Sequence, residues 1–297
     1  MPISRRLMGV SKSVAANVRA IFGYGSAGSM TNLVSSIGVV SANVTGVGTA
    51  RSSLAASGYG NDKAIFGYGY SGGYVSMTNL VSNAGVVATD TTGVGTARRY
   101  LSASRYGTDK ALFGYGYSIS GNIALTNLVS NTGIVATDTT GIGTARIYLA
   151  AAGYGSDKAI FGYGYTNVTV SMTNLVSNTG VVATDTTGVG TTRSQLAASG
   201  YGNDKAIFGY GGTTVSVSMT NKVSNTGVVA TDTTGVGTAR YSLAAAGYGS
   251  DKAIFGYGTT GTVSSLTNLV SNTGVVAINT TGVGTARHSL AASSYGS

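Results

Sequence analysis

Residues 54–69 read LAASGYGNDKAIFGYG, and close copies of this stretch recur along the whole chain. Its second half, AIFGYG or a near copy, occurs six times, and these copies hold every Phe of the protein. Successive phenylalanines lie 44, 47, 48, 47 and 47 residues apart: Phe22, Phe66, Phe113, Phe161, Phe208 and Phe255. A fixed period of this length, kept over 297 residues, predicts stacked or ring-closed repeats.

A typical unit, residues 51–97, divides into four short apolar segments separated by turn signals. We name them segment A (53–60), segment B (63–69), segment C (76–82) and segment D (86–90). Four short strands at this spacing predict an antiparallel meander. A meander of this size cannot bury both of its faces alone, so neighbouring units must stack on it.

Two all-β architectures fit repeated meanders, a β-propeller and an open β-solenoid. Units of 40 to 50 residues match propeller blades, whereas solenoid coils are usually shorter. No apolar stripe of helical period is long enough to predict a helix. We therefore expect residues 18–297 to form an all-β, six-bladed β-propeller with four-stranded antiparallel blades of about 47 residues each.

The units resemble the kelch repeat, which places an Arg before strand A, a Gly-Gly ending on strand B and a turn between strands C and D. In this chain the second slot reads Gly-Tyr-Gly, the turn reads Ser-Asn-Thr-Gly, and Val replaces the usual Trp of strand D. The repeated arginines are Arg51, Arg98, Arg146, Arg193, Arg240 and Arg287. The near-identical units are also similar to repetitive propeller-type proteins of marine tailed phages, which implies a virion component, outside the cell.

The two ends of the chain both offer an inner strand for the first unit. A good copy of segment A ends the chain at residues 289–296, and a poor copy, LMGVSKS, lies at residues 7–13. The better match favours the C-terminal copy, which would close the ring and remove an exposed sheet edge. Residues 1–17 would then be a basic N-terminal arm. The alternative is that residues 7–13 form the first inner strand and the C-terminus adds an extra one.

Charge is unevenly distributed along the chain. The net charge is +9, and residues 1–19 contribute four basic residues without an acid. Arg5, Arg6 and Lys12 are therefore our candidates for anchoring the arm to an acidic partner, such as another virion protein. Elsewhere the basic residues recur once per unit beside an Asp, so nucleic-acid binding is not expected. No apolar run approaches 18 residues, and no membrane span is expected.

The residue types needed for catalysis or metal binding are scarce. The chain has no Cys, no Glu and one His, His288, so we expect no catalytic residue, no metal ligand and no cofactor. All nine acids are Asp, five in the A–B turn and four in segment D. We expect them to cap turns and pair with the repeated Arg or Lys. The alternative is a ring of carboxylates that binds cations.

The units differ mainly in the loop between segments B and C and in the two residues after the repeated Arg. In a four-stranded meander these connections lie at the same end of the blades. Loops on a rigid scaffold commonly carry binding specificity, although such loops also tolerate neutral change. Tyr and Arg are enriched at binding hot spots. The candidate binding residues are Tyr70, Tyr74, Arg99, Tyr100, Tyr117 and Tyr148.

We therefore expect a non-enzymatic structural or adhesion module, a phage tail, fibre or capsid-associated protein. Its variable face would bind a host surface glycan or protein. The alternative is a soluble carbohydrate-binding propeller lectin, although the Trp and Glu common in sugar sites are absent. An enzyme similar to propeller oxidases is a third possibility, and it lacks the Cys and multiple His that those sites need.

Overall fold

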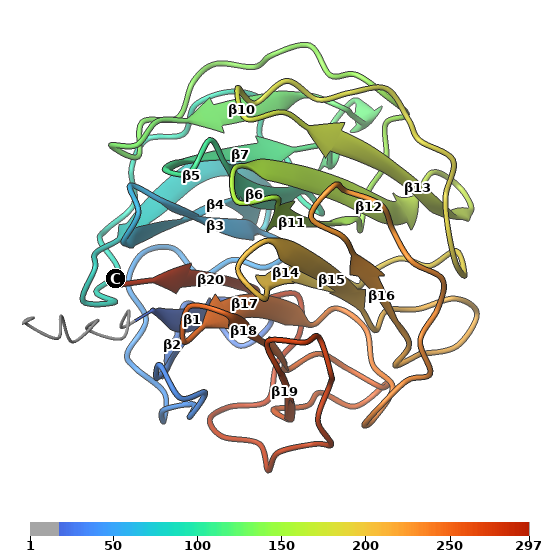
Figure 1. The fold of residues 1–297 in the computed structure, drawn as a ribbon. Coiled ribbons are helices and arrows are strands. Elements are labelled where there is room, and N and C mark those ends of the chain that lie inside the picture. The colour runs from blue at the N-terminus through green and yellow to red at the C-terminus, as the bar shows by residue number, and fades with distance from the viewer. Residues whose placement is uncertain (1–17, 297) are drawn as a thin grey trace, which may run out of the picture.

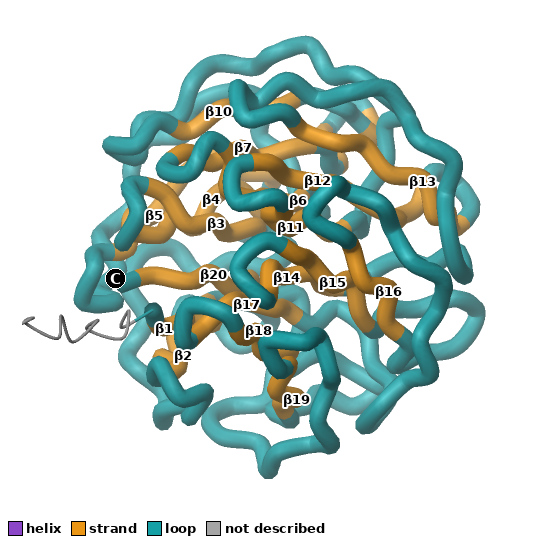
Figure 2. Tube along the Cα trace, in the orientation of Figure 1, coloured by secondary structure: helices purple, strands orange, loops and turns teal. Residues whose placement is uncertain are grey.

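The computed structural model describes residues 18–296, which form strands and loops without a helix (Figures 1 and 2). Most strands belong to six three-stranded antiparallel sheets. A seventh, two-stranded sheet is a small hairpin of β8 (Tyr117–Ser118) and β9 (Gly121–Asn122) in the B–C loop of the third unit. The expectation of an all-β repeat fold is confirmed.

Each three-stranded sheet has an inner, a middle and an outer strand, and these correspond to segments A, B and C. The inner strands are β3 (Ala55–Tyr59), β6 (Ser102–Tyr106), β11 (Ala150–Tyr154), β14 (Ala197–Tyr201), β17 (Ala244–Tyr248) and β20 (Ala291–Tyr295). The middle strands are β1 (Arg19–Gly23), β4 (Lys63–Tyr70), β7 (Lys110–Gly114), β12 (Lys158–Tyr165), β15 (Lys205–Gly209) and β18 (Lys252–Gly256). The outer strands are β2 (Thr31–Val34), β5 (Tyr74–Val81), β10 (Thr126–Val129), β13 (Thr169–Val176), β16 (Thr220–Val223) and β19 (Thr267–Val270).

Segment D is not a continuous strand, so the expectation of four-stranded sheets is wrong in this detail. In the second unit, segment D and the residue after it touch β5 at two isolated bridges, Val81↔Val87 and Thr78↔Thr91. Between them the side chain of Asn79 donates to the carbonyl of Ala88 at 3.0 Å. A side-chain amide therefore takes the place of a ladder hydrogen bond, and the same pattern recurs in every unit.

The first sheet is built from both ends of the described chain. β20 pairs antiparallel with β1, from Arg19↔Tyr295 to Gly23↔Ala291, and β2 completes the sheet. Figure 1 shows β20, in red, alongside β1, in blue. The expectation that the C-terminal copy of segment A pairs with the first segment B is confirmed. The alternative strand at residues 7–13 lies outside the described residues.

The repeated AIFGYG motif forms the joint between successive sheets. Phe113 lies against Gly67 of the preceding sheet so closely that a Cβ on that glycine would be 2.6 Å from the ring. The same phenylalanine meets the edge of Tyr68, with ring centroids 5.1 Å apart, and both rings are fully buried. Only glycine leaves room for this approach. Equivalent Phe–Tyr pairs occupy all six joints of the described chain.

Neighbouring inner strands lie side by side in the order β3, β6, β11, β14, β17 and β20, and β20 in turn lies beside β3. Backbone hydrogen bonds link the residues just before these strands into a closed cycle of six. The bonds run from N–H to C=O as Ser53 to Ser289, Ser289 to Ser242, Ser242 to Gln195, Gln195 to Tyr148, Tyr148 to Tyr100 and Tyr100 to Ser53. We call this cycle the backbone ring. Each of the six residues has a positive φ, between 52° and 59°.

Candidate binding site

The variable segments lie together at one end of the sheets, as expected. The residue after the repeated Arg forms an isolated bridge with the start of the B–C loop in five of the units. These bridges are Ser52↔Tyr70, Arg99↔Tyr117, Ile147↔Tyr165, Ser194↔Gly212 and Tyr241↔Thr259. The residue that follows belongs to the backbone ring. Several B–C loops carry an exposed apolar residue, including Ile119 at 91%.

Arg99 lies at the centre of the predicted binding residues. Its guanidinium carbon is 4.7 Å from the ring centroid of Tyr70 and 4.6 Å from that of Tyr100. Two further rings stand at 5.4 Å (Tyr74) and 6.0 Å (Tyr117). Each distance is within the range of a cation–π contact. The guanidinium is therefore surrounded by four aromatic rings from the second and third units.

The rings also contact one another, which joins the whole set into one surface. Tyr74 lies between Tyr70, at 5.8 Å, and Tyr117, at 6.1 Å. Tyr100 packs against Tyr148 of the fourth unit with centroids 4.1 Å apart. All six predicted residues are thus contiguous and half-buried. We call them the tyrosine–arginine patch.

Two polar groups of the patch lie in poorly solvated surroundings. The Nε of Arg99 is buried and has no hydrogen-bond partner among the described residues. Burial raises the pKa of Tyr148, and its contact with Tyr100 raises that pKa further, although the charge of Arg99 opposes the shift. Tyr148 therefore stays protonated and can donate a hydrogen bond at neutral pH. A buried donor without a partner calls for an acceptor, which a bound ligand could supply.

Comparison of the units indicates that the scaffold does not need the patch. Ser52 and Ser194 occupy the bridge position of Arg99 in other sheets. Ser53 and Gln195 occupy the ring positions of Tyr100 and Tyr148, with φ of 57° in both cases. The same backbone therefore forms without aromatic side chains or a cation at these sites.

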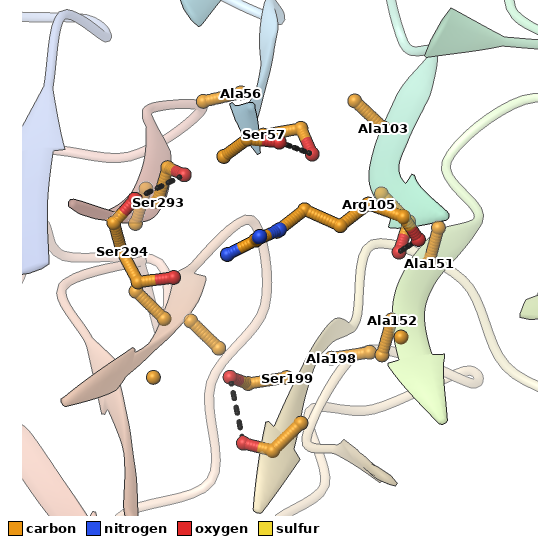
Figure 3. Close-up of a pocket in the computed structure, with 18 of the residues that line it drawn as sticks. Ala56, Ser57, Ala103, Arg105, Ala151, Ala152, Ala198, Ser199, Ser293 and Ser294 are labelled. Carbon is orange, nitrogen blue, oxygen red and sulfur yellow. Dashed lines mark hydrogen bonds between the residues drawn. The ribbon is translucent and has the colours of Figure 1, made fainter. Parts of the chain in front are cut away.

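A cavity of about 460 Å³ lies among the inner strands, and none of the binding residues predicted from the sequence lines it (Figure 3). Small residues such as Ala56, Ala198 and Ser199 form much of its lining. Arg105 of β6 projects into it between Ser57, Ser199 and Ser294. Alignment of the units provides the missed signal, because no other unit has a charged residue at this position.

The aspartates have the structural contacts that the repeat predicts. In segment D, Asp90 accepts bonds from the backbone N and Oγ1 of Thr49 in the preceding connection, at 3.0 and 2.7 Å. Arg51 lies 3.7 Å from the same carboxylate. In the A–B turns each Asp pairs with the following Lys, for example Asp204 with Lys205 at 2.7 Å. Within residues 18–296, no three acidic or histidine side chains converge as a metal site would require.

Arg5, Arg6 and Lys12 lie outside the described residues, and so does the predicted anchoring arm of residues 1–17. No helix in residues 18–296 is long and apolar enough to cross a membrane. No protein-family model matches the chain, and a search of curated proteins gave no match.

Proposed function

We propose that residues 18–297 form a closed six-bladed propeller that serves as a non-enzymatic adhesion module. Three features support the architecture. The backbone ring returns to its first member, β20 lies beside β3, and a second cycle joins the A–B turns, for example Gly60 N–H to Asp109 C=O at 2.7 Å. Such closure would leave no inner strand without neighbours on both sides.

The tyrosine–arginine patch is the proposed binding surface. Its contiguity is the observation that carries this proposal, because four tyrosine rings from two units surround the guanidinium of Arg99 and the fifth, Tyr148, packs on one of them. Tyr and Arg combine a large apolar contact area with hydrogen-bonding groups, and they dominate binding energy at many interfaces. Ile119, the exposed residue of the B–C loop that begins with Tyr117, would add apolar contact area.

The proposed setting is a phage virion, with the patch facing a bacterial surface glycan or protein and the basic arm anchoring the module. This setting rests on the resemblance to repetitive propeller-type phage proteins. Electron microscopy of the native particle tests it: disc-shaped density lost on deletion of residues 1–17 is expected. A free monomer that is indifferent to this deletion would contradict the virion setting.

The patch can be removed without changing the backbone it stands on. Tyr100→Ser and Tyr148→Gln install the side chains that Ser53 and Gln195 carry at equivalent positions with nearly the same φ. We expect the double variant to lose most of its binding to bacterial cells, at least about tenfold in affinity, because hot-spot residues contribute about 2 kcal/mol or more each. The measurement is cell binding of fluorescently labelled protein.

A control on the opposite, nearly uniform end is Asn131→Ser, which copies Ser36 of the first unit. It should bind like the wild type, and all three proteins should keep similar melting temperatures. Equal binding by wild type and double variant would reject the patch. A parallel loss of melting temperature and binding would instead make these tyrosines structural.

The lectin alternative concerns the same patch, because tyrosine rings can stack on sugar rings. Periodate treatment of the cells destroys glycans, whereas protease treatment removes surface proteins. Loss of binding after periodate alone would favour a lectin, and loss after protease alone would favour a protein receptor.

A further inference from the structure

Arg105 is a departure from the repeat in the middle of the molecule. It lies on β6, the inner strand of the third sheet, and its side chain enters the central cavity. At the same position the other inner strands have a glycine or a serine: Gly58, Gly153, Gly200, Gly247 and Ser294. The scaffold itself therefore requires only a small residue there.

The guanidinium keeps most of its hydrogen-bonding capacity. One terminal nitrogen donates to the carbonyl of Thr108, and this is its only hydrogen bond within residues 18–296. Figure 3 shows the rest of the group in the space between Ser57, Ser199 and Ser294. A guanidinium has five N–H donors in a planar fork, so several remain for a ligand.

No acid of the cavity lining neutralises Arg105. The lining contains one Asp, Asp157, which is engaged with Lys158 at 2.9 Å. Lys205 and Lys252, also in the lining, pair with the aspartates that precede them, at 2.7 and 2.9 Å. Burial lowers the pKa of Arg105, and the negative charge of Asp109 opposes that effect. Among the described residues, Arg105 is thus the cation of this lining without an ion-pair partner.

The cavity has one polar, accessible end. Six leucines that directly follow the backbone ring line the other end: Leu54, Leu101, Leu149, Leu196, Leu243 and Leu290. At the A–B turns the lining includes Asn203, Lys158 and Lys205, which are exposed to solvent. A small solute can therefore enter from the A–B side and meet Arg105 before the apolar end.

We propose that Arg105 and the cavity around it form a binding site for a small oxyanion, a carboxylate or a phosphate. A guanidinium binds two oxygens of either group through parallel N–H···O bonds. The poorly solvated surroundings strengthen such a bond relative to one on the open surface. The hydroxyls of Ser57 and Ser199 now donate to carbonyls of their own strands at 3.3 Å, and they can rotate toward a bound anion.

Titration calorimetry with inorganic phosphate and with acetate tests this site on the full chain. The wild type should bind at least one of the two anions in a saturable way. Arg105→Gly, which copies the consensus of four other units, should weaken that binding by about tenfold or more. Arg105→Lys keeps the charge but not the fork, and it should bind with intermediate affinity.

A matched control removes one positive charge elsewhere. Lys222→Leu restores the leucine that the other outer strands carry: Leu33, Leu80, Leu128, Leu175 and Leu269. It should bind as the wild type does. The proposal is wrong if neither anion binds the wild type, if Arg105→Gly binds equally well, or if Lys222→Leu weakens binding as much. Arg105 would then only fill the cavity and hold the A–B turn.

Discussion

The repeated arginine is the most demanding residue of each joint, because it buries a full charge. Arg98 is completely buried; its Nε donates to the carbonyl of Tyr115 at 2.9 Å, and its Nη2 to Oδ1 of Asn127 at 2.7 Å. It also lies over the ring of Tyr68 at 4.2 Å, with Asp138 at 4.0 Å. A buried charge that loses such partners is strongly destabilising, which explains why the whole set recurs together.

Two joints depart from this pattern. Asn279 and Asn43 replace the aspartate near Arg240 and Arg287, and they keep the hydrogen bonds to Thr238 and Thr285 without the negative charge. At the joint between the last and first sheets, Nη2 of Arg287 and Oδ1 of Asn32 are also buried without a hydrogen-bond partner within residues 18–296. At these two joints, on either side of the sixth sheet, the charge of the buried arginine is therefore less well compensated than at the other four.

Asn279→Asp should stabilise the protein at neutral pH by about 1 kcal/mol, because hydrogen bonds to a charged acceptor are stronger and Arg240 gains a counter-ion. The reverse change at the equivalent position, Asp232→Asn, should destabilise by a similar amount. The two sites have the same arrangement, since Asp232 and Asn279 each accept bonds from the backbone N–H of an equivalent Thr and from the side-chain amide of an equivalent Asn. Urea denaturation at pH 7 measures both effects.

The pH dependence of stability is a second test of the charge at Asp232. Burial raises the pKa of Asp232, but hydrogen bonds from Thr191 and Asn221 and the charge of Arg193 outweigh it, so the net pKa is lowered. A carboxyl group whose pKa is lower in the folded than in the unfolded protein stabilises the fold at pH values above its unfolded pKa, which is about 3.9 for Asp. This stabilisation is lost as the pH falls through the folded pKa. The difference in free energy of unfolding between the wild type and Asp232→Asn should therefore disappear below about pH 4. A difference that stays constant down to pH 2 would contradict an ionic contribution.

At the scale of the strand, glycines of the same sheet have opposite tolerance for a side chain. A Cβ on Gly209 of β15 would lie 2.7 Å from the ring of Phe255 in the next sheet. A Cβ on Gly200 of β14 would face the cavity, with its nearest neighbour, the carbonyl of Gly153, at 3.4 Å. Neither glycine has a positive φ, so space alone separates them.

Gly209→Ala should lower the free energy of unfolding by about 1–3 kcal/mol, because overpacking forces the phenylalanine or the backbone to shift. Gly200→Ala should change it by less than about 1 kcal/mol. Thermal or urea unfolding of the two variants measures the difference. Equal effects of the two substitutions would contradict the view that the Phe–Gly contact, rather than strand propensity, requires a glycine at position 209.

The sequence predicts the strands better than the connections for a physical reason. Segments A to C place buried side chains at fixed positions, and the repetition of Phe66 and its equivalents makes those positions visible. Segment D fails as a strand because Asn79 replaces part of its ladder, which no hydrophobic pattern reveals. The six patch residues could be chosen because they differ between units. Their contacts with one another, and the position of Arg105 in a cavity, depend on three-dimensional packing between units.

At the scale of the whole molecule, the first sheet joins the first and the last strand of the described chain. β20 supplies the inner strand beside β1, and it also lies against β3 and β17. Deleting residues 290–297 would leave the inner edge of β1 unpaired. Unpaired edges of this kind invite pairing with other chains.

We expect the 290–297 deletion to be less stable and to oligomerise, as measured by analytical ultracentrifugation and thermal unfolding. A circular permutant is the matched control. It joins residue 296 to residue 18 and opens the A–B turn after Gly202, so all strands are retained. It should remain monomeric to the same extent as the parent chain. A deletion variant as stable and as dispersed as the permutant would show that β20 is dispensable.

The antiparallel pairing of β1 with β20 also determines how the molecule would respond to mechanical force. Arg19 and Tyr295 are the first pair of the ladder and also the pair nearest to the two ends of the chain. Tension applied between those ends would therefore break the ladder bonds one after another, as a zipper opens, rather than shear them all at once. An adhesion module loaded through both ends would yield at low force, whereas one loaded through a single end would leave this ladder unstressed.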